Sequence, residues 1–413
     1  MSSENRQGSR RQNFRRKTGD RRQEPRAEGG ESYRWVETEA GLAEVVEAIS
    51  AEPRFALDTE FHRERTYYPK VALVQIAWDK AQHVVLIDPL KVDIAPLASA
   101  LSGPGMVVMH AAQQDLEVLQ RACDTVPAVL FDTQIAAGFV GLSSPSLSTL
   151  SDRFLRQRLP KGDRLTDWFQ RPLNQAQREY AASDVLYLEE IHDLLVADLT
   201  ERGRVEWARD ECEKLRVKPL GDSDPTTAWQ KIKEARHLRG QARCIARELG
   251  AWRETTAQNT DQPVRFVLSD LALVAVSQKA PATIDQLRSV RGLDGRHLKD
   301  GAGTLILEAV QRGADLPEDA IESARTTTPT LERRLRPAVT LVSAWISQLA
   351  RDSDLDPALL ATRSDIIDFL RDEPDASLRE GWRQDIVGSR ITSLVDGRAA
   401  LAFDDGALVL VER

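Results

Sequence analysis

One seven-residue stretch constrains this chain more than any other. Residues 55–61 read Phe-Ala-Leu-Asp-Thr-Glu-Phe, an apolar run that carries two acids. The run predicts a buried strand, on which residues i and i+2 project to the same face. Asp58 and Glu60 would therefore stand side by side at the end of that strand. Two such carboxylates repel each other, and a fold tolerates them mainly where a cation lies between them. Taken alone, however, such a pair more often marks only the polar end of a strand.

Two later segments add acids of the same kind. A strand at 106–109 leads into a helix with Asp115 in its first turn, where an acid can also simply satisfy free N–H groups. In Tyr-Ala-Ala-Ser-Asp, helical spacing places Tyr180 and Asp184 on one face, although a half-buried tyrosine beside a solvated acid would fit too. Together the segments predict a site for two divalent ions, Mg²⁺ or Mn²⁺, that clamp the attacking and leaving oxygens of a phosphoryl displacement. The tyrosine hydroxyl could orient the attacking water.

The order of the expected elements predicts a mixed α/β sheet with helices on its faces. Strands are expected at 55–60, 71–78, 84–87 and 107–109, and helices at 38–50, 113–121, 133–140, 146–154 and 174–199. A Pro- and Gly-containing linker at 213–227 leads to a helical region with a weak internal repeat. Asp405-Gly406, between two apolar runs, predicts a terminal hairpin.

The composition indicates in which compartment the protein works and what kind of surface charge it has. No apolar run is long enough to span a membrane, and the polar, Arg-rich N-terminus predicts no signal peptide. Three widely spaced cysteines favour a reducing cytoplasm. The net charge of −8 excludes a uniformly basic coat but not a local basic groove. The first 30 residues are basic and nearly devoid of apolar side chains, so a disordered tail is expected, either a solubilising extension or an RNA-binding arm.

The motifs around these acids resemble the bacterial ribonuclease D family, within the DEDD superfamily of 3′→5′ exonucleases. Residues 58–69 are similar to its first exonuclease motif, and residues 110–118 to its second. The third is carried by Thr166-Asp167-Trp168, Arg171-Pro172-Leu173 and residues 180–185, where the Tyr-x-x-x-Asp spacing is that of the tyrosine subclass. The resemblance covers about residues 33–215.

The resemblance implies a ribonuclease H-like fold with a mixed five-stranded sheet. It also implies a metal-dependent exoribonuclease that releases 5′-mononucleotides from single-stranded RNA 3′ ends, tRNA precursors included. The expected catalytic residues are Asp58, Glu60, Asp115, Tyr180 and Asp184, and the four acids among them are the expected metal ligands. Lys161 falls where some relatives place a lysine near the substrate phosphate. Tyr68 could stack on a base, or equally well pack in the core.

The helical half resembles a second family. Residues 229–310 are similar to the helicase-and-ribonuclease-D C-terminal (HRDC) domain, a small helical bundle that assists nucleic-acid binding, and 331–413 look like a divergent copy. The domains expected are a tail at 1–32, an exonuclease domain at 33–215, and HRDC-type bundles at 223–313 and 325–413. Arg236 and Arg243 belong to an arginine stripe that could bind RNA or form a solvated face. A monomer is expected.

Two other functions stay open at this point. An exonuclease of the same chemistry could act mainly on DNA, since the sequence shows no contact to a 2′-hydroxyl. A catalytically silent RNA-binding scaffold is the other possibility. The complete set of acids with Tyr180 speaks against the scaffold, because a scaffold has no need to keep like charges crowded together.

Overall fold

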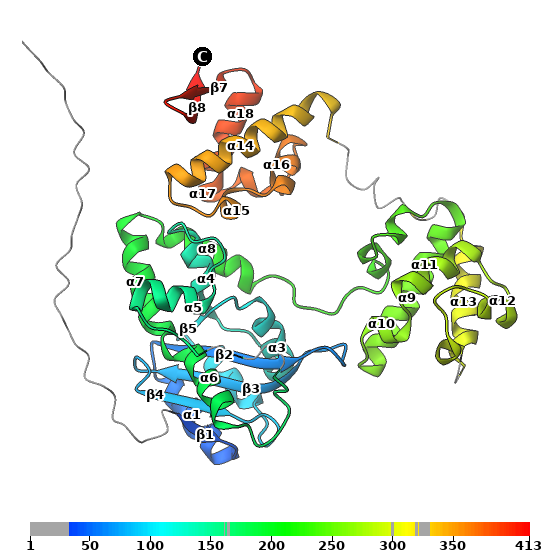
Figure 1. Cartoon of the computed structure of the whole chain (residues 1–413), viewed down its shortest axis with the longest axis horizontal. Coiled ribbons are helices and arrows are strands. Elements are labelled where there is room, and N and C mark those ends of the chain that lie inside the picture. Colours follow the sequence, from blue (N-terminus) through cyan, green and yellow to red (C-terminus); the bar gives the residue numbers. More distant parts are fainter. Residues whose placement is uncertain (1–32, 161, 163–165, 299–300, 319–320, 322–330) are drawn as a thin grey trace, which may run out of the picture. The chain divides into compact units, whose positions relative to one another are not determined.

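A computed structural model describes residues 33–160, 162, 166–298, 301–318, 321 and 331–413 (Figure 1). The expected basic tail at 1–32 and Lys161 lie outside the described residues. No helix of the described chain has both the length and the hydropathy to span a membrane.

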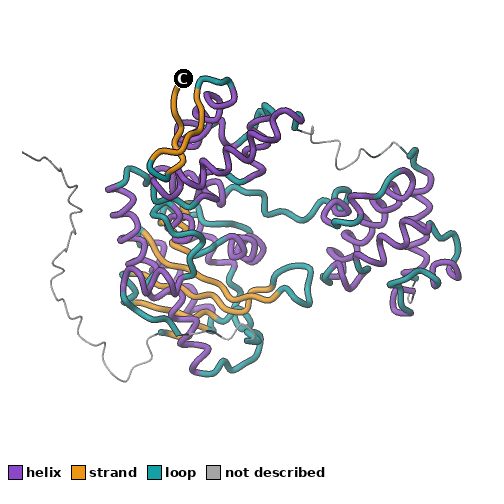
Figure 2. The backbone as a smooth tube through the Cα atoms, turned by 45° about the horizontal axis from the view of Figure 1, so that its top comes forward, coloured by secondary structure: helices purple, strands orange, loops and turns teal. Residues whose placement is uncertain are grey.

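The N-terminal half is built on one mixed sheet, seen as the larger group of orange segments in Figure 2. Its strands are β1 (Arg34–Val36), β2 (Arg54–His62), β3 (Lys70–Trp78), β4 (His83–Ile87), β5 (Met106–Met109) and β6 (Val129–Asp132). Their order across the sheet is β1-β4-β3-β2-β5-β6. Strands β2, β3 and β4 pair antiparallel, whereas β1–β4, β2–β5 and β5–β6 pair parallel. The sheet therefore has six strands where the resemblance implied five. Strands β1 and β6 lie outside the four strands expected by residue range, and β1, with three residues, is too short to show a periodic pattern.

Eight helices accompany this sheet in the described chain: α1 (Glu39–Ser50), α2 (Ala98–Leu101), α3 (Gln113–Cys123), α4 (Thr133–Gly138), α5 (Leu147–Leu150), α6 (Gln175–Leu186), α7 (Leu188–Glu201) and α8 (Val205–Arg216). The single helix expected at 174–199 is divided at Tyr187 into α6 and α7. The helix expected at 146–154 is α5 followed by a π-helical turn, Ser151–Leu155.

The alternation of side chains along β2 gives the sheet two different faces. Phe55 and Leu57 are buried in a core with α1, α2 and α3, whereas Ala56 is buried in a core with α4, α6 and α7. With the period of two, Asp58 and Glu60 fall on the same face as Ala56. The strand thus directs both acids toward the layer that contains α6.

Beyond α8 the described residues form helices until the final hairpin. The first set is α9 (Gly240–Thr260), α10 (Val264–Val267), α11 (Asp270–Lys279), α12 (Ile284–Arg288) and α13 (Ala302–Asp315). The second is α14 (Arg336–Asp352), α15 (Pro357–Leu360), α16 (Arg363–Leu370), α17 (Gly381–Arg383) and α18 (Ser389–Val395). Each set opens with a long helix, then a helix of four residues, then one of eight to ten, which agrees with the weak repeat in the sequence.

The expected terminal hairpin is present as β7 (Ala399–Asp404) and β8 (Ala407–Glu412). Asp405 and Gly406 join the two strands, both with positive φ, which is the backbone that a two-residue type I′ turn requires.

Candidate active site

The site lies where one side of the sheet ends early. Strand β2 pairs with β5 only over Arg54–Ala56, because β5 stops at Met109. From Leu57 onward β2 keeps its other neighbour, β3, but extends past the end of β5. Asp58 and Glu60 stand on this extension. The ends of β2 and β5 therefore leave an opening in which polar side chains can gather.

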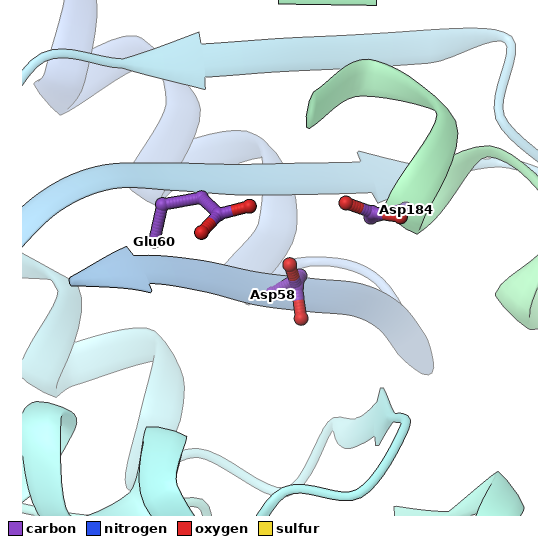
Figure 3. Close-up of side chains that lie close together, drawn as sticks. All are labelled: Asp58, Glu60 and Asp184. Atoms are coloured by element: carbon purple, nitrogen blue, oxygen red, sulfur yellow. The ribbon is translucent and has the colours of Figure 1, made fainter. Parts of the chain in front are cut away.

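Helix α6 brings a third acid to the same place. The helix begins with a capping box, in which Asn174 accepts from the Gln177 amide and the Gln177 side chain accepts in return from the Asn174 amide. Three turns later Asp184 faces β2, and carboxylate oxygens of Asp58, Glu60 and Asp184 lie within 4.8 Å of one another (Figure 3). The spacing of two on a strand and four on a helix thus brings together the acids that the sequence singled out.

Asp115 comes from a different layer of the fold. It lies in the first turn of α3, directly after β5, and is 7% exposed. The turn into α3 contains Ala111 with a φ of 57°, and Asp132 accepts hydrogen bonds from the amides of Ala111 and Ala112. The Thr59 hydroxyl then donates to the Asp115 carboxylate at 2.5 Å. Asp115 is not one of the three clustered acids, but it lines the same cavity as they do.

Burial raises the pKa of every acid at the site, and the charges of neighbouring site acids raise the pKa of Asp58 and Glu60 further. The pKa of Glu60 rises to about 8, first through burial and then through the charges of Asp184 and Asp115. Burial raises the pKa of Asp184 to about 7, against a hydrogen bond from Tyr180 that lowers it. Burial likewise raises the pKa of Asp115 to about 6, although the Thr59 hydroxyl opposes this. The pKa of Asp58 is raised well above its ordinary value by burial and by the three neighbouring carboxylates.

These raised pKa values indicate that the four carboxyl groups lack a compensating positive charge. A carboxylate that must hold a proton because its neighbours are also acids releases that proton when a cation takes its place. The donors are carboxylate oxygens, which suit a hard divalent cation. The His110 imidazole, which also lines the cavity, hydrogen-bonds through Nδ1 to the Thr133 hydroxyl at 2.9 Å. The residues present therefore fit divalent metal ions.

Tyr180 stands on the face of α6 that also bears Asp184, one turn earlier. Burial first and then the charge of Asp184 raise the pKa of the Tyr180 phenol, with further contributions from Glu60, Asp58 and the hydrogen bond to Asp184. The ring is stacked on Trp168, with ring centroids 6.1 Å apart and planes inclined at 29°. The phenol therefore stays protonated at neutral pH, and a neighbouring aromatic ring fixes its orientation.

Two cavities meet at this group. The first, of about 560 Å³, is lined by Asp58, Glu60, Asp115, Tyr180 and Asp184, among others. The second, of about 760 Å³, shares Glu60, Phe61, Gln114 and Tyr180 with the first. It continues along residues 61–66 and 166–169. Space for a ligand thus extends from the acids along the β2–β3 connection.

Two of the residues expected to bind substrate, Tyr68 and Arg243, make contacts within the protein. The Arg121 guanidinium lies 3.3 Å from the centroid of the Tyr68 ring, and the Tyr68 hydroxyl donates to Asp222 at 3.1 Å. Arg243 donates to the carbonyl oxygens of Leu238 and Ile321, both at 3.0 Å. Roles for Tyr68, Arg243 and Lys161 in substrate binding stay predictions.

Arg236 is exposed, in a short 3₁₀ turn, Ala235–His237. Exposure of this kind fits both interpretations of the arginine stripe, an RNA-binding surface and a solvated face. Its role stays a prediction as well.

Sequence reasoning missed several supporting groups. Asp132 caps α4 and also holds the turn into α3. Asp88 accepts from the Leu90 amide, as an acid in a turn does, and also forms a buried ion pair with Arg171. The hydrogen bond from Thr59 to Asp115 joins residues 56 positions apart, and no local sequence pattern predicts it.

Comparison with known proteins agrees with this geometry. The model of a 3′-5′ exonuclease family matches residues 33–200, and that of the HRDC domain matches residues 243–310. Ribonuclease D of Gluconacetobacter diazotrophicus is 35% identical over 378 residues, which cover 89% of this chain and 94% of that protein. Ribonuclease D of Escherichia coli is 32% identical, with 88% of this chain and 98% of that protein covered.

A solved structure extends the likeness to three dimensions. The crystal structure of Escherichia coli RNase D, described as an exoribonuclease involved in structured RNA processing, superposes with a TM-score of 0.78 at 32% identity. The match covers 88% of this chain and 99% of that one. Fold and sequence agree over nearly the whole length of these relatives, so the chain belongs to the ribonuclease D family and is a hydrolytic 3′-5′ exoribonuclease.

Proposed function

We propose that this exoribonuclease releases 5′-mononucleotides one at a time from single-stranded 3′ ends, tRNA precursors among them, with two Mg²⁺ or Mn²⁺ ions. The ligands proposed are Asp58, Glu60, Asp115 and Asp184. The observation that carries the proposal is the cluster of three carboxylates within 4.8 Å, all with raised pKa values, beside Tyr180. When bound, the ions supply an activated water and offset the charge of the departing 3′ oxygen.

Tyr180 has a defined part in this proposal. Its phenol stays protonated and hydrogen-bonds to Asp184, so its single proton is committed to that carboxylate. The remaining lone pairs of the phenol oxygen can then only accept, and a water in the cavity can donate to them. Such a bond leaves a lone pair of the water free for attack on the terminal phosphorus. Tyr180 acts here by orientation and not as a base.

The second cavity offers room for the terminal nucleotides. It adjoins the acids at Glu60 and is lined by polar and aromatic side chains, His62, Arg63 and Phe169 among them. Arg63 forms an ion pair with Glu117 at 2.7 Å, so its charge is already compensated in the absence of RNA. We propose that the terminal base and phosphate enter here, with the scissile bond above Glu60 and Tyr180.

A time course on a 3′-tailed tRNA and a DNA oligonucleotide of matched sequence, with and without EDTA, tests substrate, direction and metal need together. We expect a ladder that shortens from the 3′ end of the RNA, slower cleavage of the DNA, and no products in EDTA. Faster cleavage of the DNA would favour the DNA-directed alternative instead.

Asp58→Asn tests the ligand assignment. The substitution keeps the shape of the side chain but replaces one carboxylate oxygen by an amide nitrogen, so activity in Mg²⁺ should fall at least about hundredfold. Asp124→Asn is the matched control, because Asp124 is an exposed residue with positive φ after α3, a conformation that asparagine also tolerates. An Asp58→Asn variant as active as the Asp124→Asn variant would show that the acids do not hold the ions.

The domain boundaries are part of the proposal. Exonuclease residues 33–215, an HRDC domain at 223–313 and a divergent HRDC-like domain at 325–413 agree with the repeated order of helix lengths in the two helical sets. The monomeric state expected from the sequence stays a prediction, which light scattering of the full chain would test. Cytoplasmic location also stays a prediction; the three cysteines are buried and free, as a reducing compartment favours.

A further inference from the structure

Arg171 has every donor of its guanidinium engaged. Nε donates to Asp88 Oδ2 at 2.8 Å, and Nη2 donates to Asp88 Oδ1 at 2.8 Å and to the Ala72 carbonyl at 2.7 Å. Nη1 donates to the carbonyls of Trp168 at 2.7 Å and Gln170 at 3.0 Å. A guanidinium has five N–H donors, and here they meet five acceptors.

The pair is held away from water. The Asp88 side chain is 2% exposed and that of Arg171 is 17% exposed. Asp88 directly follows β4, where its amide donates to the Val36 carbonyl at 2.8 Å, and Ala72 lies on β3. Asp88 and Ala72 thus provide two anchor points on the rigid sheet, and Arg171 joins both of them to the segment 168–171.

That segment carries the ring that stacks on Tyr180. Arg171 binds the backbone carbonyl of Trp168 itself, and the partly buried Trp168 side chain packs against the core of the exonuclease half. The Asp88–Arg171 pair does not line the cavity that the four acids share. A path of direct contacts therefore runs from the sheet through Arg171 and Trp168 to the phenol beside Asp184.

We propose that Asp88 and Arg171 are positioning residues for the reaction: they fix Trp168, and Trp168 fixes the hydroxyl of Tyr180. The inference rests on the role proposed above for Tyr180 and adds the residues that hold its hydroxyl in place. A shift of about 1 Å in a reacting group can cost about a hundredfold in rate, so the accuracy of this support matters for catalysis. A lysine cannot replace the arginine, since an ammonium group cannot reach five acceptors in a planar fork.

A double-mutant cycle tests the proposal. The single-turnover rate of removing the first nucleotide from a 5′-labelled oligoribonucleotide in Mg²⁺ is measured for the parent, Arg171→Lys, Tyr180→Phe and the double variant. We expect Arg171→Lys to slow the parent at least about tenfold, with the affinity for RNA changed less than about twofold. In the Tyr180→Phe protein, which has no hydroxyl left to misplace, the same substitution should change the rate less than about twofold.

Arg383→Lys is the matched control. Arg383 also forms a bidentate, largely buried pair with a carboxylate, Glu211, but in contact with neither Trp168 nor Tyr180. The Arg383→Lys substitution should lower the melting temperature while leaving the single-turnover rate within about twofold of the parent rate. A loss of rate in Arg383→Lys as large as in Arg171→Lys would show that loss of stability alone explains the effect, and would overturn the proposal.

The outcomes separate the two proposals. If Tyr180→Phe slows cleavage but the effects of Arg171→Lys and Tyr180→Phe multiply, Arg171 does not act through the phenol, and the positioning proposal is wrong while the function stands. If Tyr180→Phe cleaves at the parent rate, the role of Tyr180 and the positioning proposal fail together, whereas the metal-ligand assignment is judged by Asp58→Asn.

If the Arg171→Lys protein does not fold, the Trp168→Leu variant tests the positioning proposal in its place. Leucine keeps an apolar side chain at this partly buried position against the core but removes the stacking partner of Tyr180. We expect Trp168→Leu to slow single-turnover cleavage as Arg171→Lys does. In the Tyr180→Phe protein, we expect it to cause no further loss of rate. A folded Trp168→Leu protein with the parent rate would overturn the proposal.

Discussion

The crowded acids make the stability of the metal-free protein fall as the pH rises. The pKa of Glu60 is about 8 in the fold, against 4.5 for an ordinary glutamate. Because the folded value is the higher one, the fold favours the protonated form. Stability is therefore fully present below about pH 4.5 and is lost as the pH rises toward about 8. At about 1.4 kcal/mol per pKa unit, Glu60 can account for at most about 5 kcal/mol.

Equilibrium urea unfolding, followed by tryptophan fluorescence in EDTA at about pH 5.5 and about pH 8.5, measures this loss. We expect Glu60→Gln to reduce the loss by roughly 2–3 kcal/mol relative to the parent, since part of the stabilisation is already lost at pH 5.5 and the amide takes no part in the titration. Glu206→Gln is the control, because that side chain is 73% exposed and its pairing with Arg209 is a surface contact. Saturating Mg²⁺ should stabilise the parent more at the higher pH, where its ligands are ionised.

One result would refute this reasoning. If the parent and Glu60→Gln lose the same free energy of unfolding between the two pH values, the carboxyls at the end of β2 are neither crowded nor desolvated. The argument for bound cations would then lose its electrostatic basis. If Mg²⁺ stabilises both proteins equally at either pH, binding does not depend on proton release from these groups.

Three other measurements probe the same site. Thr59→Val removes the hydroxyl that lowers the pKa of Asp115, so the half-saturating Mg²⁺ concentration in the cleavage assay should rise roughly five- to thirtyfold. A Cβ added at Gly162 would overlap the Tyr180 ring, so Gly162→Ala should slow single-turnover cleavage about ten- to hundredfold; Gly221→Ala, whose Cβ would meet nothing within 4 Å, should keep the parent rate. Because the site acids lose protons on metal binding, the half-saturating Mg²⁺ concentration, titrated at each pH, should fall between about pH 6 and about pH 8.5, and a constant value would contradict this.

The acids of the site could be predicted because local geometry governs them. A period of two on β2 and a spacing of four on α6 were enough to pair Asp58 with Glu60 and Tyr180 with Asp184. Asp115 needed the resemblance, since an acid in the first turn of a helix has an ordinary structural explanation.

The supporting contacts could not be predicted, because they join residues far apart in the sequence. Arg171 and Asp88 are 83 positions apart, and no periodicity links them. Tyr68 shows another case: its aromatic ring fitted base stacking and core packing equally well, and in the structure Arg121 lies over one face of the ring. Which surface of an aromatic side chain stays free is decided by packing, and a single sequence does not contain that information.

The early end of β5 matters for more than access. Had that strand continued alongside β2 by another two residues, the turn into α3 would begin later, and Asp115 in the first turn of that helix would be carried away from Asp58 and Glu60. The assembly of the four acids therefore depends on the length of a strand as much as on the identity of the side chains. In a redesign, an insertion after Met109 would separate Asp115 from the other acids while leaving all four of them in the sequence.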